Sequence, residues 1–428
     1  MRLIRLLNLS RILSGINTTK GIGLAKHPDA FFLFISYGKK KKMTLQDFYA
    51  EWNSAEDSLL VHTSGSTGAP KPMMVEKQRM LNSARRTCDF LSLKRGDTAF
   101  LCMPLDFIAG KMVVVRTIER NMKLITVPPS NHPFRTLIEN YRKKGENAEE
   151  MVIDFAAMVP SQVFCSLSVP EERKMLERVK HLIIGGGAID PELSDALQNL
   201  PNNVWSTYGM TETLSHIALR RVNGREASEW YEPFDSVNIS LLPDENSKEG
   251  RGLLVIDAPE VSVSRLVTND ICELHADGRR FRILGRKDNV ICSGGIKLQI
   301  EEIEAALHPF LNFPFCISRR HDRKFGEVAV LSLAPKGSES DIALVGPESK
   351  AVPECSGSNV ALEGSESKAA LSLHQKESIL SLLSSAFQTL PKYSVPKDIV
   401  FVPEIPLTAT GKINRMACES LAASNSQK

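Results

Sequence analysis

A loop rich in glycine, serine and threonine constrains this chain more than any other feature of its sequence. Residues 62–71 read His-Thr-Ser-Gly-Ser-Thr-Gly-Ala-Pro-Lys and directly follow the apolar run 59–61, so we expect the loop to leave a β-strand. Glycines let backbone N–H groups turn toward an anion, hydroxyl groups add hydrogen-bond donors, and a lysine adds a positive charge. No Gly-Lys-Ser/Thr follows at the spacing of a Walker A loop. The sequence therefore favours another kind of polyphosphate-binding loop over a solvated turn, with the candidate residues Thr63, Ser64, Gly65, Ser66, Thr67, Gly68 and Lys71.

The composition fits a folded protein of 428 residues with two or more domains. Hydrophobic residues make up 42% and charged residues 24%, and the net charge of +3 is too small to indicate a nucleic-acid partner. The eight cysteines are scattered, without a Cys-x-x-Cys pair or zinc-ligand spacing, which predicts reduced thiols in a cytoplasmic protein. No apolar run is long enough to span a bilayer. We therefore expect small-molecule partners, and a homodimer stays an open alternative.

The first 42 residues differ from the rest of the chain. Residues 1–28 carry arginine and lysine but no acid, and their leucines could form an amphipathic stripe, a composition typical of a mitochondrial transit peptide. The alternative is an upstream translation start, because Met43 begins a fresh segment in which Thr44 is a good helix N-cap. We favour Met43 as the initiator and expect residues 1–42 to be a non-core N-terminal extension.

Strands and helices alternate along the first half of the chain, which predicts an α/β domain with a mostly parallel sheet flanked by helices. A β-rich part with charged turns is expected over residues 236–284. The expected strands lie at 59–61, 99–103, 124–127, 151–155 and 182–184. A short helix and turn are expected over 44–58, and helices at 76–91 and 108–121.

The chain is expected to change domain near Asp288, which divides a large domain, residues 43–287, from a small mobile α+β lid, residues 288–428. Residues 336–368 interrupt the lid and are rich in Ser, Glu, Gly and Pro, so we expect a disordered insertion loop there. The elements expected in the lid are helices at 299–307 and 378–390 and a strand at 328–334.

Four motifs, in this order, resemble those of the adenylate-forming (AMP-binding) superfamily, which includes the acyl-CoA synthetases. The first is the loop at 62–71, and the second is Tyr208-Gly209-Met210-Thr211-Glu212-Thr213. The third is Gly285-Arg286-Lys287-Asp288, continuing to Gly294-Gly295-Ile296-Lys297, and the fourth is Pro406-Leu407-Thr408-Ala409-Thr410-Gly411-Lys412. The resemblance covers most of residues 44–335 and 371–417. Most members carry a longer chain before the phosphate loop, so an N-terminal subdomain is expected to be missing or reduced here.

The resemblance implies a reaction with ATP, Mg²⁺ and coenzyme A. A carboxylate attacks the α-phosphate of ATP to give an acyl-adenylate, and a thiol then displaces AMP. On this basis Lys71 and the loop hydroxyls hold the β- and γ-phosphates, while Thr211 reaches the α-phosphate. Glu212 matches the acid that holds Mg²⁺, and Lys412 matches the lysine that bridges the carboxylate and the α-phosphate.

The same resemblance assigns further positions to the nucleotide and to CoA. Tyr208 could stack on the adenine or be a core tyrosine, and both readings stay open. The other assigned positions are Gly186, Gly187 and Ala188 beside the adenine, Asp270 at the ribose, Arg286 at the nucleotide, Asp288 at the hinge, Gly295 beside the pantetheine tunnel, and Gly209 and Lys297 as further cofactor-binding residues.

The acyl pocket is expected around the helix that follows Met103-Pro104-Leu105-Asp106 and around the residues after Glu212. Lys111 is unusual at the mouth of an otherwise apolar helix and suits a substrate with a second anion. This pattern most resembles the o-succinylbenzoate–CoA ligases of menaquinone synthesis, in a compact branch. The candidate substrate-binding residues are Phe107, Lys111, Ser215, His216 and Arg220.

Two other functions stay open. The chain could load a different acid, such as an aryl or fatty acid, onto CoA or onto a carrier protein. It could also be a non-catalytic nucleotide-binding scaffold that has kept the fold. The presence of Lys71, Glu212, Asp270 and Lys412 together favours an active enzyme.

Overall fold

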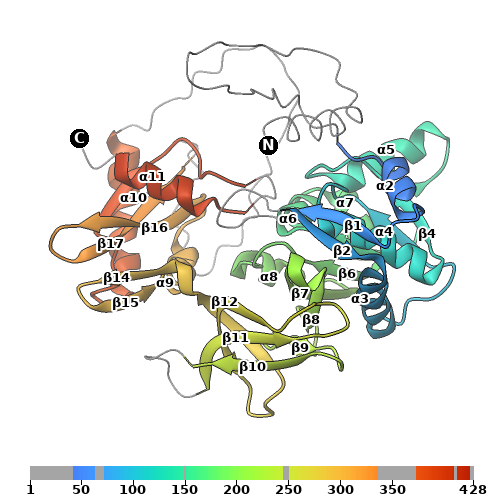
Figure 1. Ribbon diagram of the computed structural model, residues 1–428. Helices are drawn as coiled ribbons and strands as arrows, with labels where there is room; N and C mark the ends of the chain where they lie inside the picture. Colours follow the sequence, from blue (N-terminus) through green and yellow to red (C-terminus); the bar gives the residue numbers. More distant parts are fainter. Residues whose placement is uncertain are drawn as a thin grey trace, which may run out of the picture. The chain divides into compact units, whose positions relative to one another are not determined.

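The computed structural model describes residues 42–62, 72–148, 151–243, 250–335, 373–408 and 412–424 (Figure 1). The phosphate loop from Thr63 to Lys71 and the expected insertion at 336–368 lie outside these residues. The chain divides into two units, Met1–Met43 and Thr44–Lys428, and all elements below belong to the second.

The second unit begins with helix α2 (Leu45–Trp52), whose start is fixed by a capping box. The Thr44 hydroxyl accepts a hydrogen bond from the Asp47 N–H at 3.1 Å, and the Thr44 N–H donates to the Asp47 carboxylate at 3.0 Å. The prediction of Thr44 as an N-cap is therefore confirmed. Strands β1 (Ser58–His62) and β2 (Pro72–Glu76) follow as an antiparallel pair in which His62 lies opposite Pro72. The loop sequence at 63–71 thus connects two paired strand ends.

A seven-stranded sheet has the order β4-β3-β5-β6-β7-β8-β9. Strands β3 to β7 pair in parallel, as the alternation of strands and helices predicts, whereas β8 and β9 are antiparallel. The reason lies in residues 210–215, because a link that short cannot make the crossover that a parallel strand requires. The strands are β3 (Thr98–Leu101), β4 (Lys123–Thr126), β5 (Ile153–Met158), β6 (Val179–Ile184), β7 (Asn203–Gly209), β8 (His216–Arg221) and β9 (Glu232–Pro233).

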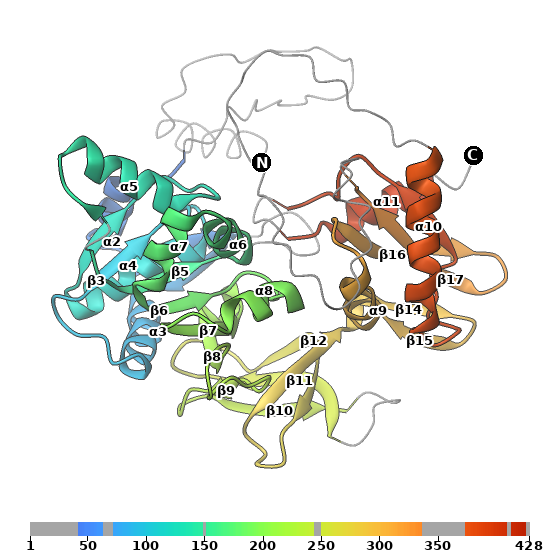
Figure 2. The same ribbon diagram turned by 180° about the vertical axis from the view of Figure 1, so that it is seen from behind.

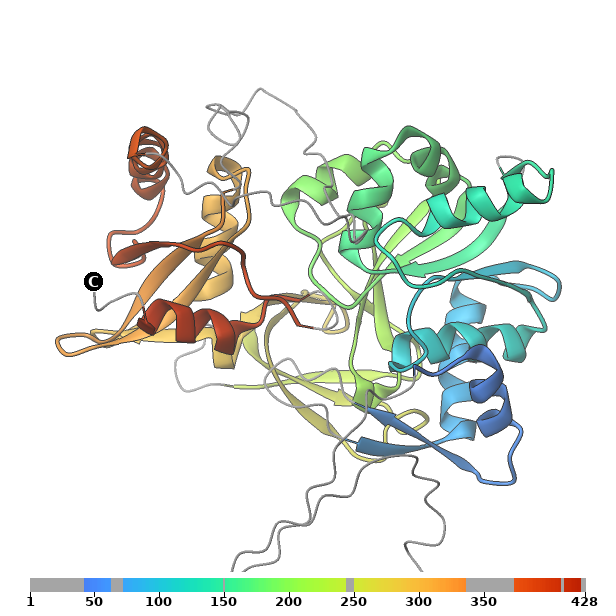
Figure 3. The same cartoon turned by 90° about the horizontal axis from the view of Figure 1, so that it is seen from above.

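Helices cover both faces of this sheet, α3 and α4 on one and α5 to α8 on the other (Figures 1 and 3). The helices on the second face each begin with proline in the first turn, where the missing N–H costs no hydrogen bond. Strand β5 is buried along most of its length because it is covered from both sides. The helices are α3 (Lys77–Phe90), α4 (Ile108–Arg120), α5 (Pro133–Lys143), α6 (Pro160–Ser168), α7 (Pro170–Glu177) and α8 (Pro191–Leu197).

The expected β-rich part is an antiparallel sheet with the order β10-β11-β12-β13. In its register Asp270 lies opposite Arg286, so a carboxylate and a guanidinium face each other across two neighbouring strands. The strands are β10 (Asn238–Leu242), β11 (Arg251–Asp257), β12 (Leu266–Leu274) and β13 (Phe281–Arg286).

The C-terminal part is α+β, as predicted. Its sheet has the order β15-β14-β17-β16, and β18 pairs with β17 in parallel. Alternate side chains point to opposite faces: Ile317 and Leu331 join the cluster under α9 and α10, whereas Cys316 and Val330 join the cluster under α11 (Figure 2). The elements are β14 (Val290–Ser293), β15 (Ile296–Gln299), α9 (Ile300–Leu307), β16 (Phe315–Asp322), β17 (Gly326–Leu333), α10 (Leu373–Gln388), β18 (Asp398–Phe401) and α11 (Arg415–Ser424).

Candidate active site

The second motif forms a tight turn between β7 and β8. A Cβ atom on Gly209 would lie 2.2 Å from the carbonyl oxygen of Ser215, so only glycine fits where the two strands meet. The Thr213 hydroxyl accepts from the Met210 N–H at 3.0 Å and donates to the Ser215 carbonyl at 2.7 Å, which holds the turn. Leu214 completes it with φ of 66°, a strained value for a residue with a side chain.

This turn presents Thr211 and Glu212 differently. Thr211 is buried, whereas the Glu212 side chain is exposed, and no hydrogen bond or ion pair engages it within the described part of the chain. No cluster of three or more His, Cys, Asp or Glu side chains that could hold a metal occurs among the same residues. A single free carboxylate fits Mg²⁺, which commonly takes one or two protein oxygens and completes its shell with phosphate and water.

Asp270 is the centre of a charged cluster on β12 and β13. The Tyr208 hydroxyl donates to one carboxylate oxygen at 2.5 Å, and Arg286 donates to the other at 3.2 Å. A second N–H group of Arg286 donates to Asp288 at 2.8 Å. Burial alone would lower the pKa of Arg286, but the carboxylates of Asp288 and Asp270 outweigh it and raise that pKa. The positions expected at the ribose, the nucleotide and the hinge are therefore brought together.

Tyr208 combines a packing contact with this polar one. Its ring meets Phe281 edge to face, with the centroids 5.2 Å apart, and Tyr231 lies 6.0 Å away. Burial, and then the neighbouring Asp270 carboxylate, raises the pKa of its hydroxyl well above the usual value, so the hydroxyl remains a donor. This tyrosine thus belongs to an aromatic cluster and also orients Asp270.

Lys412 lies at the closed end of the fourth motif. The Thr408 N–H donates to the Lys412 carbonyl at 2.7 Å, and the Lys412 N–H donates to the Thr408 hydroxyl at 3.2 Å. Burial lowers the pKa of the Lys412 amine, the charge of Arg286 lowers it further, and Asp270 opposes both. The ammonium is therefore within electrostatic reach of the Asp270 cluster. Directly beyond it, Arg415 anchors the segment through two hydrogen bonds to Glu304, at 2.5 and 2.7 Å.

The glycine positions of the other motifs lie in exposed turns. Gly186 has φ of +83° just after β6, where Gly187 and Ala188 are also exposed. Gly295, with φ of +85°, lies in the hairpin between β14 and β15, and Lys297 on β15 is exposed. These turns leave backbone accessible at the positions assigned to adenine and pantetheine.

The structure places Lys111 differently from the sequence-based expectation. The helix begins at Ile108, where it is expected, after the extended residue Phe107; the difference lies in the surroundings of Lys111. Its side chain is 2% exposed, and its ammonium lies 3.7 Å from the Glu51 carboxylate and over the ring of Phe48. Burial lowers the pKa of this amine, and Glu51 opposes the shift. The charge of Lys111 is thus engaged with α2, and not free at the mouth of an acyl pocket.

Arg220 is likewise occupied elsewhere. It donates to the Ser228 carbonyl at 3.0 Å and stacks 5.5 Å from the centre of the Tyr231 ring. It therefore does not join Ser215 and His216, the other two residues expected after Glu212.

The cation that does meet Ser215 and His216 is Arg116, which the sequence analysis missed. Arg116 is 1% exposed and donates from Nη2 to the Ser215 hydroxyl at 2.7 Å and to the Thr87 hydroxyl at 3.3 Å. His216 bridges the same two hydroxyls, at 3.3 and 2.8 Å. The signal in the sequence was an arginine directly after the apolar helix residues Met112-Val113-Val114-Val115, because a charged side chain is rarely buried without partners.

This cluster contains a buried charge without a matching carboxylate among the residues the structure describes. The Nε atom of Arg116 has no hydrogen-bond partner there, and burial lowers the pKa of the guanidinium to about 10. A buried charge is costly unless an opposite charge and hydrogen bonds compensate it. Ser215 is the member of the cluster with partial exposure, so an anion would approach beside it.

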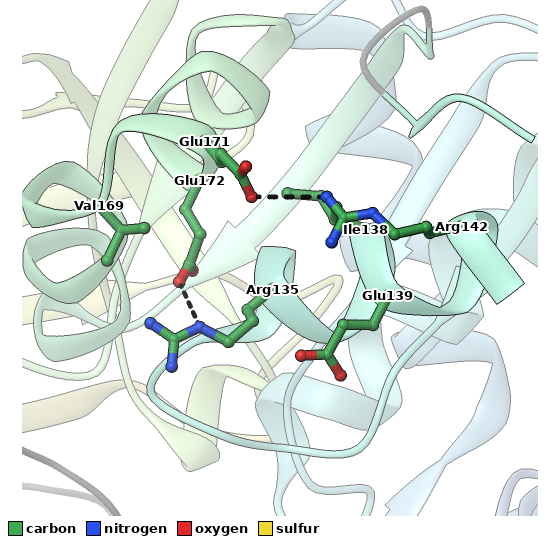
Figure 4. A pocket seen from close by; sticks show the side chains of 7 residues that line it. All are labelled: Arg135, Ile138, Glu139, Arg142, Val169, Glu171 and Glu172. Carbon is green, nitrogen blue, oxygen red and sulfur yellow. Dashed lines mark ion pairs between the residues drawn. The ribbon is translucent and has the colours of Figure 1, made fainter.

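One pocket of the described residues lies apart from these positions. A cavity of about 230 Å³ between α5 and α7 is lined by Arg135, Ile138, Glu139, Arg142, Val169, Glu171 and Glu172 (Figure 4). Arg135 pairs with Glu172 at 3.6 Å, and Arg142 with Glu171 at 3.9 Å. Its arginines are already neutralised and none of the expected site residues lines it, so we do not assign the reaction to this cavity.

The sequence profile of the family described as AMP-binding enzyme matches residues 24–261, more than half of the 428 residues. The chain therefore belongs to the AMP-binding enzyme family. The match begins ahead of residue 44, where the motif resemblance begins, so part of the expected N-terminal extension falls within it. No helix in the described residues is long and apolar enough to cross a membrane.

Two curated relatives are 2-succinylbenzoate–CoA ligases. The enzyme from Haemophilus influenzae is 24% identical over 273 residues, which cover 62% of this chain and 56% of that one. The enzyme from Bacillus cytotoxicus is 22% identical over 417 residues, which cover 90% of this chain and 74% of that one. The chain thus aligns with only part of the length of either relative.

Two solved structures have a similar fold. An acyl-CoA synthetase (AMP-forming)/AMP-acid ligase II-like protein from Dyadobacter fermentans is 29% identical with a TM-score of 0.50, covering 87% of this chain and 91% of that one. The o-succinylbenzoate coenzyme A synthetase from Bacillus subtilis, in complex with ATP and magnesium ion, is 20% identical with a TM-score of 0.59. Here the match covers 83% of this chain and 68% of that one. The α/β fold class is therefore confirmed.

Proposed function

We propose that this protein ligates o-succinylbenzoate to coenzyme A through an acyl-adenylate, with ATP and Mg²⁺, as a step of menaquinone synthesis. The observation that carries the proposal is Arg116, a buried cation beside the second ATP motif whose partners among the described residues are neutral. The names of the two curated relatives support the same acid.

The nucleotide end of the site is assigned to the four motifs. Lys71 and the loop hydroxyls hold the β- and γ-phosphates, and Thr211 meets the α-phosphate. Glu212, exposed and unengaged in the described structure, is the candidate Mg²⁺ ligand. Bound Mg²⁺ would supply neutralisation of phosphate charge. Asp270, already oriented by Tyr208 and Arg286, accepts hydrogen bonds from the ribose hydroxyls.

Adenylation requires the substrate carboxylate to approach a phosphate of the same sign. Lys412 supplies a positive charge near Asp270 and Arg286, where the α-phosphate would lie above the ribose. Its ammonium stabilises the charge that develops on the phosphoryl oxygens during attack. Without ligands, burial and Arg286 lower the pKa of the Lys412 amine. Bound phosphates would raise that pKa again, because nearby anions favour the charged form of a lysine.

The acid end is assigned to Arg116 and Ser215. An o-succinylbenzoate molecule activated at its succinyl carboxylate carries a second carboxylate on the ring. That group loses water on binding, which is costly unless a cation and hydrogen-bond donors replace it. The guanidinium of Arg116 meets both needs, and the new ion pair also compensates the buried charge of Arg116 itself. Because the contacts of Lys111 go to α2, we assign it to packing.

The C-terminal part carries the second half-reaction in this proposal. We assign residues 43–287 to the large domain and 288–428 to a lid, with Asp288 as the hinge. The lid would present Lys412 for adenylation and then turn the exposed Gly295 turn, with Lys297, toward the CoA thiol. The ion pair between Arg286 and Asp288 lies at this proposed hinge.

The test is ATP–pyrophosphate exchange with a panel of acids, followed by a CoA-thioester assay. We expect o-succinylbenzoate to drive exchange better than benzoates or fatty acids, and CoA to convert its adenylate to the thioester. Exchange with another acid would leave an acyl- or aryl-CoA ligase or a carrier-loading enzyme. ATP binding without exchange for any acid would indicate a nucleotide-binding scaffold.

A further inference from the structure

Thr87 connects helix α3 to the buried arginine. Its side chain is fully buried, and its hydroxyl lies 3.2 Å from the Ser83 carbonyl, 2.8 Å from His216 Nε2 and 3.3 Å from Arg116 Nη2. The carbonyl can only accept a hydrogen bond and the guanidinium can only donate one. The hydroxyl has one proton, and we assign it to the Ser83 carbonyl; with this assignment His216 Nε2 is the donor in its contact with Thr87.

The same reasoning fixes the rest of the chain of hydrogen bonds. With the proton on Nε2, neutral His216 has only Nδ1 left as an acceptor, and Ser215 lies 3.3 Å from it. The Ser215 hydroxyl accepts from Arg116 at 2.7 Å and donates its own proton to Nδ1. In this network Ser215 and His216 each donate one hydrogen bond and accept one. Arg116 only donates, the Ser83 carbonyl only accepts, and Thr87 accepts from both His216 and Arg116 while it donates to Ser83.

The surroundings of His216 keep it neutral. The imidazole is buried, and the charge facing it comes from Arg116 of α4, which would repel a second cation. From α3 it meets the neutral Thr87, and from the position directly after β9 it meets the ring of Phe234 at 5.7 Å. Burial, and then Arg116, holds the pKa of His216 well below its usual range. A neutral ring with one tautomer is a fixed spacer between two hydroxyls.

We propose that Thr87 is a positioning residue for substrate selection: through neutral His216 and Ser215 it holds Arg116 where the second carboxylate of the acid binds. This inference rests on the proposed function, which requires that carboxylate. It goes beyond the proposed function because Thr87 belongs to α3, outside the four motifs, and reaches the substrate only through Arg116.

The matched variants are Thr87→Val, which keeps the shape and removes the hydroxyl, and Thr87→Ser, which keeps the hydroxyl. Two acids distinguish recognition of the ring carboxylate from activation of the other carboxylate: o-succinylbenzoate, and 4-oxo-4-phenylbutanoate, which lacks the ring carboxylate. In pyrophosphate exchange, Thr87→Val should raise the KM for o-succinylbenzoate about tenfold more than the KM for the monoacid, the scale of one hydrogen bond to a charged group. Thr87→Ser should keep the low KM for o-succinylbenzoate, and neither substitution should change the KM for ATP.

A second variant covers the case in which Thr87→Val does not fold. His216→Phe keeps a ring beside Phe234, removes both nitrogens and should produce the same loss that is selective for the diacid. Nitrogen chemical shifts of the histidine ring in the unsubstituted protein should show the neutral Nε2–H form at pH 6. A protonated ring, or equal KM changes for both acids, would overturn the positioning role.

The outcomes also separate this inference from the proposed function. If the unsubstituted enzyme prefers the diacid and Thr87→Val keeps that preference, only the role of Thr87 is wrong. If the unsubstituted enzyme has no preference for the diacid, the second carboxylate is not recognised, and both the proposed substrate and the role of Thr87 are wrong.

Discussion

Two arginines of this protein have opposite surroundings. Arg286 is 33% exposed and is bonded to two carboxylates, Asp270 and Asp288. Arg116 is almost completely buried and is bonded to the hydroxyls of Ser215 and Thr87. Within the part of the chain that the structure describes, carboxylates match the accessible charge but not the buried one, which is the reverse of what stability alone would favour. In the proposed function, the acid substrate supplies the carboxylate that pairs with Arg116.

The largest expected effect concerns Lys412, whose amine is under the influence of the charges of Arg286 and Asp270. Lys412→Ala should slow adenylation at least about 100-fold, because a charge contact made in the transition state is lost. The thioester step, measured with pre-made acyl-adenylate, should proceed. Lys392→Ala, at an exposed position of the same C-terminal part, is the control. Adenylation at the parent rate in Lys412→Ala would remove the assignment.

Replacing each arginine with methionine tests how its charge contributes to the free energy of unfolding. Arg286→Met leaves the Asp270 carboxylate without its cation, so we expect a loss of about 1–3 kcal/mol in the free energy of unfolding. Arg116→Met removes a buried charge that no carboxylate matches, and its stability should be unchanged or higher. Urea unfolding of both variants measures this. A large loss for Arg116→Met would mean that the protein itself compensates Arg116.

Several features of the fold were predictable from local sequence. The capping residue Thr44, the alternating strands and helices, and the change to an α+β part follow from periodicity and capping, which act within a few residues. The antiparallel strands β8 and β9 depend on the length of the link after Gly209, which propensity does not report.

The acid end of the site was harder to predict than the nucleotide end. The residues assigned to the nucleotide lie within short sequence motifs. Arg116, in contrast, is in a cluster with Thr87 and His216, which belong to elements distant in sequence. Lys111 and Arg116 lie on the same helix, and only the packing of α2 against that helix tells which cation is already engaged. The sequence pattern therefore drew attention to Lys111, which the structure pairs with Glu51, and passed over Arg116, to which we assign the second carboxylate.

A smaller effect concerns pH. The pKa of His216 is well below 6.5 in the folded protein and near 6.5 in the unfolded chain, so below pH 6.5 the unfolded chain binds more protons. The contribution of His216 is therefore fully present above pH 6.5 and is lost as the pH falls, by up to about 1.4 kcal/mol per unit. The free energy of unfolding should fall more steeply between pH 7 and 5.5 in the unsubstituted protein than in His216→Phe. Parallel curves would contradict the buried neutral ring.

The central claim is that the unmatched charge of Arg116 recognises a carboxylate of the substrate. It is tested most directly by kcat/KM in pyrophosphate exchange for o-succinylbenzoate and 4-oxo-4-phenylbutanoate, in the unsubstituted enzyme and in Arg116→Met. We predict that the unsubstituted enzyme prefers the diacid by at least about tenfold, the scale of a charged hydrogen bond, and that Arg116→Met loses this preference while still activating the monoacid. An unchanged preference in Arg116→Met, or none in the unsubstituted enzyme, would contradict the claim.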